Sequence, residues 1–151
     1  MWQAQHRGTM NKPDSAQLIA RILISTVFIV FGFFQFTDIA RYTNNPAILK
    51  FVAATGHILS PLIVAYLVAA IDLFAGLLIL VGYQTRIAAA VLIIFVLLTL
   101  FFAHAFWTME GPARIANQAH FYKNLTLIGG LLLILAFGPG RYSLEGRLTR
   151  S

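Results

Sequence analysis

Four long apolar segments restrict the fold of this chain more than any other feature of its sequence. They span about 18–36, 61–83, 87–107 and 121–137, and an α-helix needs roughly 20 apolar residues to cross a bilayer. The chain is 59% hydrophobic and only 11% charged, whereas soluble domains carry about 25% charged residues. Because so few polar side chains cannot cover a water-facing surface, we predict an all-α integral membrane protein, an antiparallel four-helix bundle.

The basic residues predict the orientation of these spans. An even number of spans places both termini on one side of the membrane. That side holds Arg7, Lys12, Arg21, Arg86, Arg141, Arg147 and Arg150, and the other side holds Arg41, Lys50, Arg114 and Lys123. The excess favours cytoplasmic termini by the positive-inside rule. We therefore expect a cytoplasmic tail over 1–17, a transmembrane domain over 18–140 and a basic cytoplasmic tail over 141–151.

The net charge of +6 is spread over loops and tails rather than gathered on one face. This distribution is typical of contact with anionic lipid. Membrane lipid is therefore the expected partner, and nucleic acid is not.

The first outer loop, about 37–60, contains the pattern of a short helix. Asn45 suits an N-cap, Pro46 suits the first turn, and Gly56 suits the end. The residues between them, 47–54, predict an amphipathic helix on the outer membrane face. It would be either a connector at the interface, which we prefer, or a lid over the mouth of the bundle.

Asp72 is the one charged residue in the second apolar segment and lies near its centre. A carboxylate at that depth costs about 2.5–3.5 kcal/mol on insertion scales, so chains seldom keep one without a role. It is either a functional group or a hydrogen bond that holds two helices together. Arg21 is on the order of 12 Å away along the helix axis. We therefore expect Arg21 to extend to the cytoplasmic interface and not to pair with Asp72.

Polar side chains of the first, third and fourth spans all fall near the outer ends of those spans. Together with Asp72 they form the predicted ligand-binding set: Gln35, Asp38, Asp72, His104, Trp107, His120, Lys123 and Asn124. We predict a polar cavity open to the outer face, with Asp72 at its floor, and Asp72 and His104 as candidates for a proton relay. Two histidines without a four-ligand pattern do not predict a metal site, and no metal is expected.

Several short motifs follow one another along the chain in an order that is typical of one family. They are Leu18-Ile-Ala-Arg21, the acid Asp72 followed by 73–82 and Thr85-Arg86, His104-Ala-Phe-Trp107, Phe121-Tyr-Lys-Asn-Leu125 with Gly129-Gly130, and Gly138-Pro-Gly-Arg-Tyr-Ser-Leu144. With this spacing, the chain resembles the DoxX family of small four-span membrane proteins over about 18–144. The Gly129-Gly130 pair would allow close helix approach.

The resemblance implies a bacterial inner membrane location. It also implies, for some members, association with quinone-linked oxidation of sulfur compounds or with redox complexes. The family often has Glu at the position of Asp72. No agreed catalytic set exists to carry over, and whether the chain is an enzyme stays open.

Two functions from different classes fit these features. The first is a redox-associated membrane subunit that binds a quinone near the outer cavity and takes electrons from a soluble or membrane oxidoreductase. The alternative is a non-catalytic module that binds lipid or a small molecule, or that recruits an enzyme to the membrane. A transporter ranks third because only one span carries a central charge. A homo-oligomer is left open.

Overall fold

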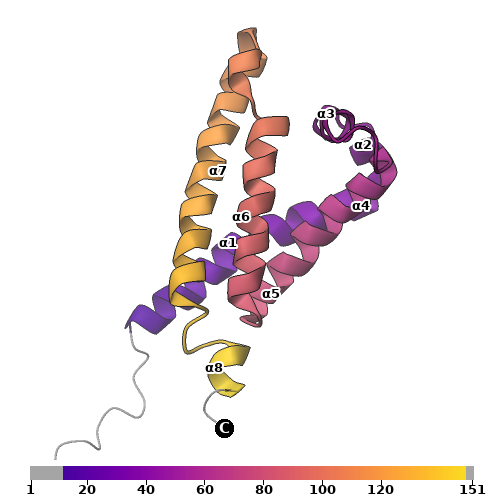
Figure 1. Ribbon diagram of the computed structural model, residues 1–151. Helices are drawn as coiled ribbons and strands as arrows, with labels where there is room; N and C mark the ends of the chain where they lie inside the picture. The colour runs from indigo at the N-terminus through magenta and orange to yellow at the C-terminus, as the bar shows by residue number, and fades with distance from the viewer. Residues whose placement is uncertain (1–11, 149–151) are drawn as a thin grey trace, which may run out of the picture.

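The computed structural model describes residues 12–148, and helices make up this part of the chain without any strand (Figure 1). The elements are α1 (Lys12–Thr37), α2 (Ile39–Thr43), α3 (Pro46–Ala54), α4 (Pro61–Ala70), the π-helix η1 (Ile71–Ala75), α5 (Gly76–Val81), α6 (Thr85–Phe102), the 3-10 helix η2 (Phe106–Thr108), α7 (Gly111–Phe137) and α8 (Leu144–Leu148). The predicted tail over 1–17 falls largely on residues 1–11, which lie outside the described part, as does Arg150.

Four helical segments are long and apolar enough to cross a membrane. They are Asp14–Thr37, Pro61–Val81, Thr85–Thr108 and Gly111–Phe137. The all-α membrane fold predicted from the sequence is therefore confirmed. The last helix begins ten residues before the predicted start at 121, because Pro112 occupies its first turn and the residues that follow are polar but compatible with a helix.

The spans form two pairs that meet at one end and separate toward the other. The first pair is α1 against α4, η1 and α5, and the second is α6 against α7. Figure 1 shows the pairs close together at the turn between α5 and α6 and spread apart toward α3. α3 contacts both α4 and α6. The bundle is therefore open at the end where α3 lies, and α3 covers part of the opening.

Two glycines allow the closest approach within the first pair. A Cβ on Gly32 would lie 2.5 Å from the backbone nitrogen of Leu73, and a Cβ on Gly76 would lie 3.0 Å from Ile29 Cγ1. Of the glycine pair expected to allow close approach, only Gly130 faces another helix, where its Cβ would meet Ile24. A Cβ on Gly129 would meet nothing within 4 Å, so the expectation is wrong for that residue.

Arg21 is buried and links the helices at the closed end of the bundle, where α5 turns into α6. Its side chain is 2% exposed, and its guanidinium donates to Pro139 O at 2.7 Å, Tyr142 O at 2.9 Å and Leu80 O at 3.2 Å. The prediction that Arg21 extends to the interface is therefore wrong. Carbonyl oxygens at the end of α5 and after α7 accept from both terminal nitrogens of the guanidinium, whereas Arg21 Nε is buried without a partner.

The segment after α7 adds to the contacts of Arg21, and we call the two sets of contacts together the Arg21 clamp. The Glu145 carboxylate accepts a hydrogen bond from Thr85 N at 3.0 Å, and Glu145 N donates to Gly82 O at 3.1 Å. The described part of the basic tail, 141–148, therefore packs on the closed end of both helix pairs. This leaves the opposite end, where α3 lies, as the freer end of the bundle.

Candidate functional site

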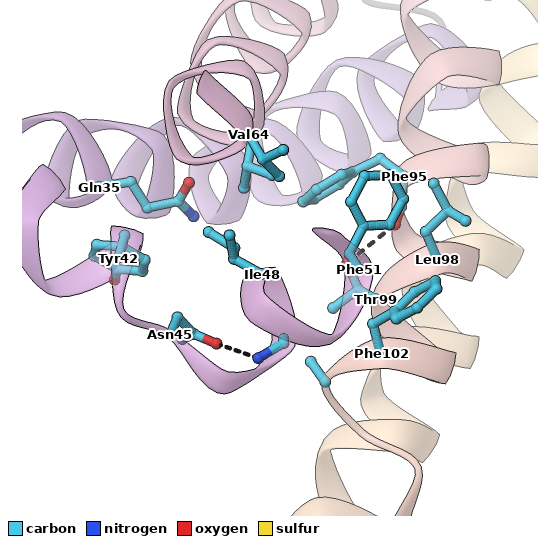
Figure 2. Close-up of a pocket in the computed structure, with 13 residues that line it drawn as sticks. Gln35, Tyr42, Asn45, Ile48, Phe51, Val64, Phe95, Leu98, Thr99 and Phe102 are labelled. Carbon is cyan, nitrogen blue, oxygen red and sulfur yellow. Dashed lines mark hydrogen bonds between the residues drawn. The ribbon is translucent and has the colours of Figure 1, made fainter. Parts of the chain in front are cut away.

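A pocket of about 210 Å³ lies beneath α3, and we call it the α3 pocket (Figure 2). It is lined by Gln35, Tyr42, Asn45, Ala47, Ile48, Phe51, Val64, Val68, Phe95, Leu98, Thr99, Phe102 and Ala103. These residues come from the end of α1, from α2 and α3, and from α4 and α6, so the pocket spans the gap between the two helix pairs. Most of its lining is apolar, whereas the sequence predicted a polar cavity.

α3 is held firmly enough to serve as a wall of this pocket. Asn45 caps it, since Asn45 Oδ1 accepts from Ala47 N at 2.9 Å. Ile48 and Val52 are buried against α4. The ring of Phe51 packs edge to face against that of Phe102, with the ring centroids 5.3 Å apart. These contacts with α4 and α6 favour the lid interpretation of this segment over that of a plain connector.

Gln35 links the pocket to the buried acid. It lines the α3 pocket, and its Nε2 donates to Asp72 Oδ2 at 2.8 Å. Gln35 is 7% exposed and Asp72 is 3% exposed. Asp72 does not itself line the pocket but is hydrogen-bonded to Gln35, which is one of the polar residues of the lining.

Asp72 sits in η1, a single π-helical turn between α4 and α5. Such turns insert one residue into an α-helix and occur often at functional sites. Here η1 packs against α1, and Gly32 leaves room for the backbone of Leu73. The close contact between α1 and η1 thus brings the carboxyl of Asp72 within reach of Gln35.

Most of the predicted ligand-binding set lies elsewhere. Asp38 is exposed at the start of α2, Trp107 and Lys123 are exposed, and Asn124 is half-buried at the middle of α7. None of these four residues lines the α3 pocket. The positions of these residues along the spans predict a common depth, but they do not predict the direction of each side chain around its helix.

The two histidines of the set form a separate contact. The rings of His104 and His120 stack with centroids 5.1 Å apart, and His104 Nδ1 lies 3.0 Å from Asn117 Oδ1. They lie away from the pocket because α6 ends at Phe102 and the chain then turns toward the start of α7. Within residues 12–148, no group of three or more His, Cys, Asp or Glu side chains could hold a metal ion.

Several pocket residues carried little signal in the sequence. Tyr42 and Thr99 are polar residues of the lining that were not predicted. Thr99 could have been found, since it is the one hydroxyl residue in the otherwise apolar stretch 87–103. The apolar lining of α3 and α4 could not, because the same residues would be expected to face lipid.

The four apolar spanning helices define the chain as a polytopic helical membrane protein. Residues 16–105 match the DoxX family. The chain therefore belongs to the DoxX family, as its motifs suggested.

Two curated relatives cover nearly the whole chain. Inner membrane protein YqjF of Escherichia coli (strain K12) is 34% identical over 137 residues, which are 91% of this chain and 95% of the relative. Inner membrane protein YphA of the same strain is 32% identical over 130 residues, or 86% and 88%. A more distant relative is the Surfeit locus protein 4 homolog of Drosophila melanogaster, 26% identical over 89% of this chain and 42% of its own length. No solved structure matches significantly.

Proposed function

We propose that this DoxX-family protein is an inner-membrane binding module whose α3 pocket holds an apolar molecule of the quinone class. The observation that carries the proposal is the combination of an apolar pocket of about 210 Å³ with one amide, Gln35, that is anchored on a buried acid. Small-molecule sites are typically apolar, with a few polar groups that fix orientation. The relatives named as inner membrane proteins support the location.

The lining offers contacts for both the ring and a carbonyl oxygen of a quinone. Ile48, Val64 and Leu98 offer apolar contact for the ring. A primary amide has two N–H donors, and Gln35 uses one for Asp72, so the second is free for a carbonyl oxygen. A bound quinone would supply two-electron, two-proton redox chemistry. Gln35 would orient it, and α3 would exclude water.

The remaining parts of the proposal concern topology and partners. We place both termini in the cytoplasm and propose that electrons come from a separate oxidoreductase, soluble or in the membrane. Asp72 remains the candidate proton-holding group behind Gln35. His104 stacks on His120 away from the pocket, so we no longer include it in the relay.

The second candidate is a non-catalytic module that binds lipid or another apolar small molecule, or that recruits an enzyme to the membrane as a scaffold. The observation that favours it is the largely apolar lining, which is also suited to an acyl chain. The two candidates differ in the need for Gln35, because the hydrocarbon part of an acyl chain has no oxygen that could accept the Gln35 N–H.

Binding of a short-chain ubiquinone analogue, decylubiquinone, to the protein in phosphatidylcholine nanodiscs tests the proposal. A ligand at 100 times its Kd raises folding stability by about 2.7 kcal/mol, which appears as a thermal shift. We expect a shift for the wild type and a loss of at least about tenfold in affinity for Gln35→Leu, equivalent to about 1.4 kcal/mol. Gln118→Leu on α7 is the matched control. Equal affinity of both variants, or no shift for the wild type, contradicts the quinone proposal.

A further inference from the structure

Two oxygen atoms of the Gln35–Asp72 pair are buried without a hydrogen-bond donor. They are Asp72 Oδ1 and Gln35 Oε1. The other two polar atoms of these groups are hydrogen-bonded to each other, since Gln35 Nε2 donates to Asp72 Oδ2 at 2.8 Å. An ionised carboxylate can only accept hydrogen bonds. An ionised Asp72 would therefore leave both oxygens unsatisfied, and each such buried group costs about 1–3 kcal/mol.

The elements packed against η1 provide no cation to compensate a buried carboxylate. These elements are α1, α4, α5 and α6. The titratable or charged residues on them are Lys12, Asp14, Arg21, Tyr66 and Arg86. Tyr66 is exposed, and the others lie near the inner ends of α1 and α6. Arg21 is bound to three carbonyl oxygens, and Arg86 donates to Ala136 O.

We infer that Asp72 carries a proton on Oδ1, and that Asp72 and Gln35 together form a proton-binding site beneath the α3 pocket. The proton turns Oδ1 into a donor, and Gln35 Oε1 is the buried acceptor on the amide that already contacts the carboxyl. One proton thus satisfies both oxygens. It also removes a charge from the apolar interior, where an unpaired carboxylate is strongly disfavoured.

Gln35 couples this site to the pocket, a step that rests on the proposed function. The same amide lines the pocket and donates to Asp72. A ligand that draws the amide toward itself weakens the hydrogen bond to Oδ2. Pocket occupancy therefore changes the environment of the bound proton.

Infrared spectroscopy of the protein in phosphatidylcholine nanodiscs at neutral pH tests the proton directly, because a protonated carboxyl has a carbonyl stretch distinct from that of a carboxylate. With isotope-labelled aspartate, we expect a label-sensitive band of this kind. Asp72→Asn should remove it, and Asp38→Asn, at an exposed position, should keep it. The absence of the band in the wild type, or its survival in Asp72→Asn, overturns the inference.

Two further measurements keep the test decisive. If Asp72→Asn does not fold, replacing Asp14 and Asp38 together leaves Asp72 as the only aspartate of the chain, so any label-sensitive band belongs to it. Gln35→Leu should move the band to higher frequency, because Oδ2 loses its hydrogen bond; an unchanged band overturns the pairing with Gln35.

The ligand-free band does not depend on the proposed function. Addition of decylubiquinone should shift the band if the amide couples the two sites. An unshifted band in protein that binds decylubiquinone by thermal shift overturns the coupling. A lack of decylubiquinone binding counts against the quinone proposal alone, since the resting band still decides whether Asp72 carries the proton.

Discussion

Replacement of Gly32 by alanine should disturb the contact that positions Asp72. The new Cβ would lie 2.5 Å from Leu73 N and 2.9 Å from Leu73 Cα. These are backbone atoms of η1, so the clash cannot be relieved by a side-chain rotation, and the two helices must separate. Overpacking of this kind costs about 1–3 kcal/mol. Alanine regains up to about 1 kcal/mol through its higher helix propensity.

We therefore expect Gly32→Ala to lower the free energy of unfolding by about 1–2 kcal/mol, the overpacking cost less part of the propensity gain. Gly129→Ala is the matched control, because its Cβ would meet nothing within 4 Å, and it should be neutral or slightly stabilising. Gly130→Ala should fall between them, since its Cβ would meet only the flexible tip of Ile24.

The assay is unfolding by sodium dodecyl sulfate in mixed micelles, followed by far-ultraviolet circular dichroism. The expected order of stability is Gly129→Ala, then Gly130→Ala, then Gly32→Ala. Gly32→Ala should also weaken decylubiquinone binding, because it moves η1 and with it the Asp72 partner of Gln35. If Gly32→Ala is as stable as Gly129→Ala, the close packing of α1 on η1 is wrong.

Two other substitutions test the Arg21 clamp and the helix α3 that forms a wall of the pocket. Arg21→Met should destabilise the protein by about 2–4 kcal/mol, since three carbonyl oxygens lose a charged donor. In the same unfolding assay, the control Arg114→Gln, at an exposed position, should change stability by less than about 0.5 kcal/mol. Equal effects of the two substitutions would contradict the role of Arg21 in the clamp. Asn45→Ala should cost about 1 kcal/mol by removing the cap of α3 and should speed hydrogen exchange in α3 relative to Asn44→Ala, whose side chain is exposed; unchanged exchange would show that the cap does not hold the wall in place.

The fold was largely predictable from the sequence, but the site was predictable only in part. Apolar length and the Asn45-Pro46 cap signal depend on local chemistry, so the spans and α3 were found. Gln35 and Asp72 were singled out because polar groups in lipid are costly. Their direct bond was not predicted, because it depends on the π-helical turn and on the approach of α1 at Gly32, neither of which has a periodicity signal.

The error over Arg21 has a related cause. Its depth suggested an extended side chain reaching water, but its partners are carbonyl oxygens far along the chain, at Leu80, Pro139 and Tyr142. Such long-range contacts cannot be read from spacing. His104 and Trp107 lie away from the pocket because α6 ends at Phe102 and the chain then turns toward α7, which depth along a span does not reveal.

Filling the α3 pocket tests most directly whether it holds a small molecule. Ala47 lines the pocket, whereas Ala53 is exposed on the same helix. The measurement is mass spectrometry of the molecules that co-purify with the intact protein, compared among wild type, Ala47→Leu and Ala53→Leu. We predict a quinone in the wild type and in Ala53→Leu, and its loss from Ala47→Leu. Retention of the same molecule by Ala47→Leu, or no bound molecule in the wild type, would contradict the account.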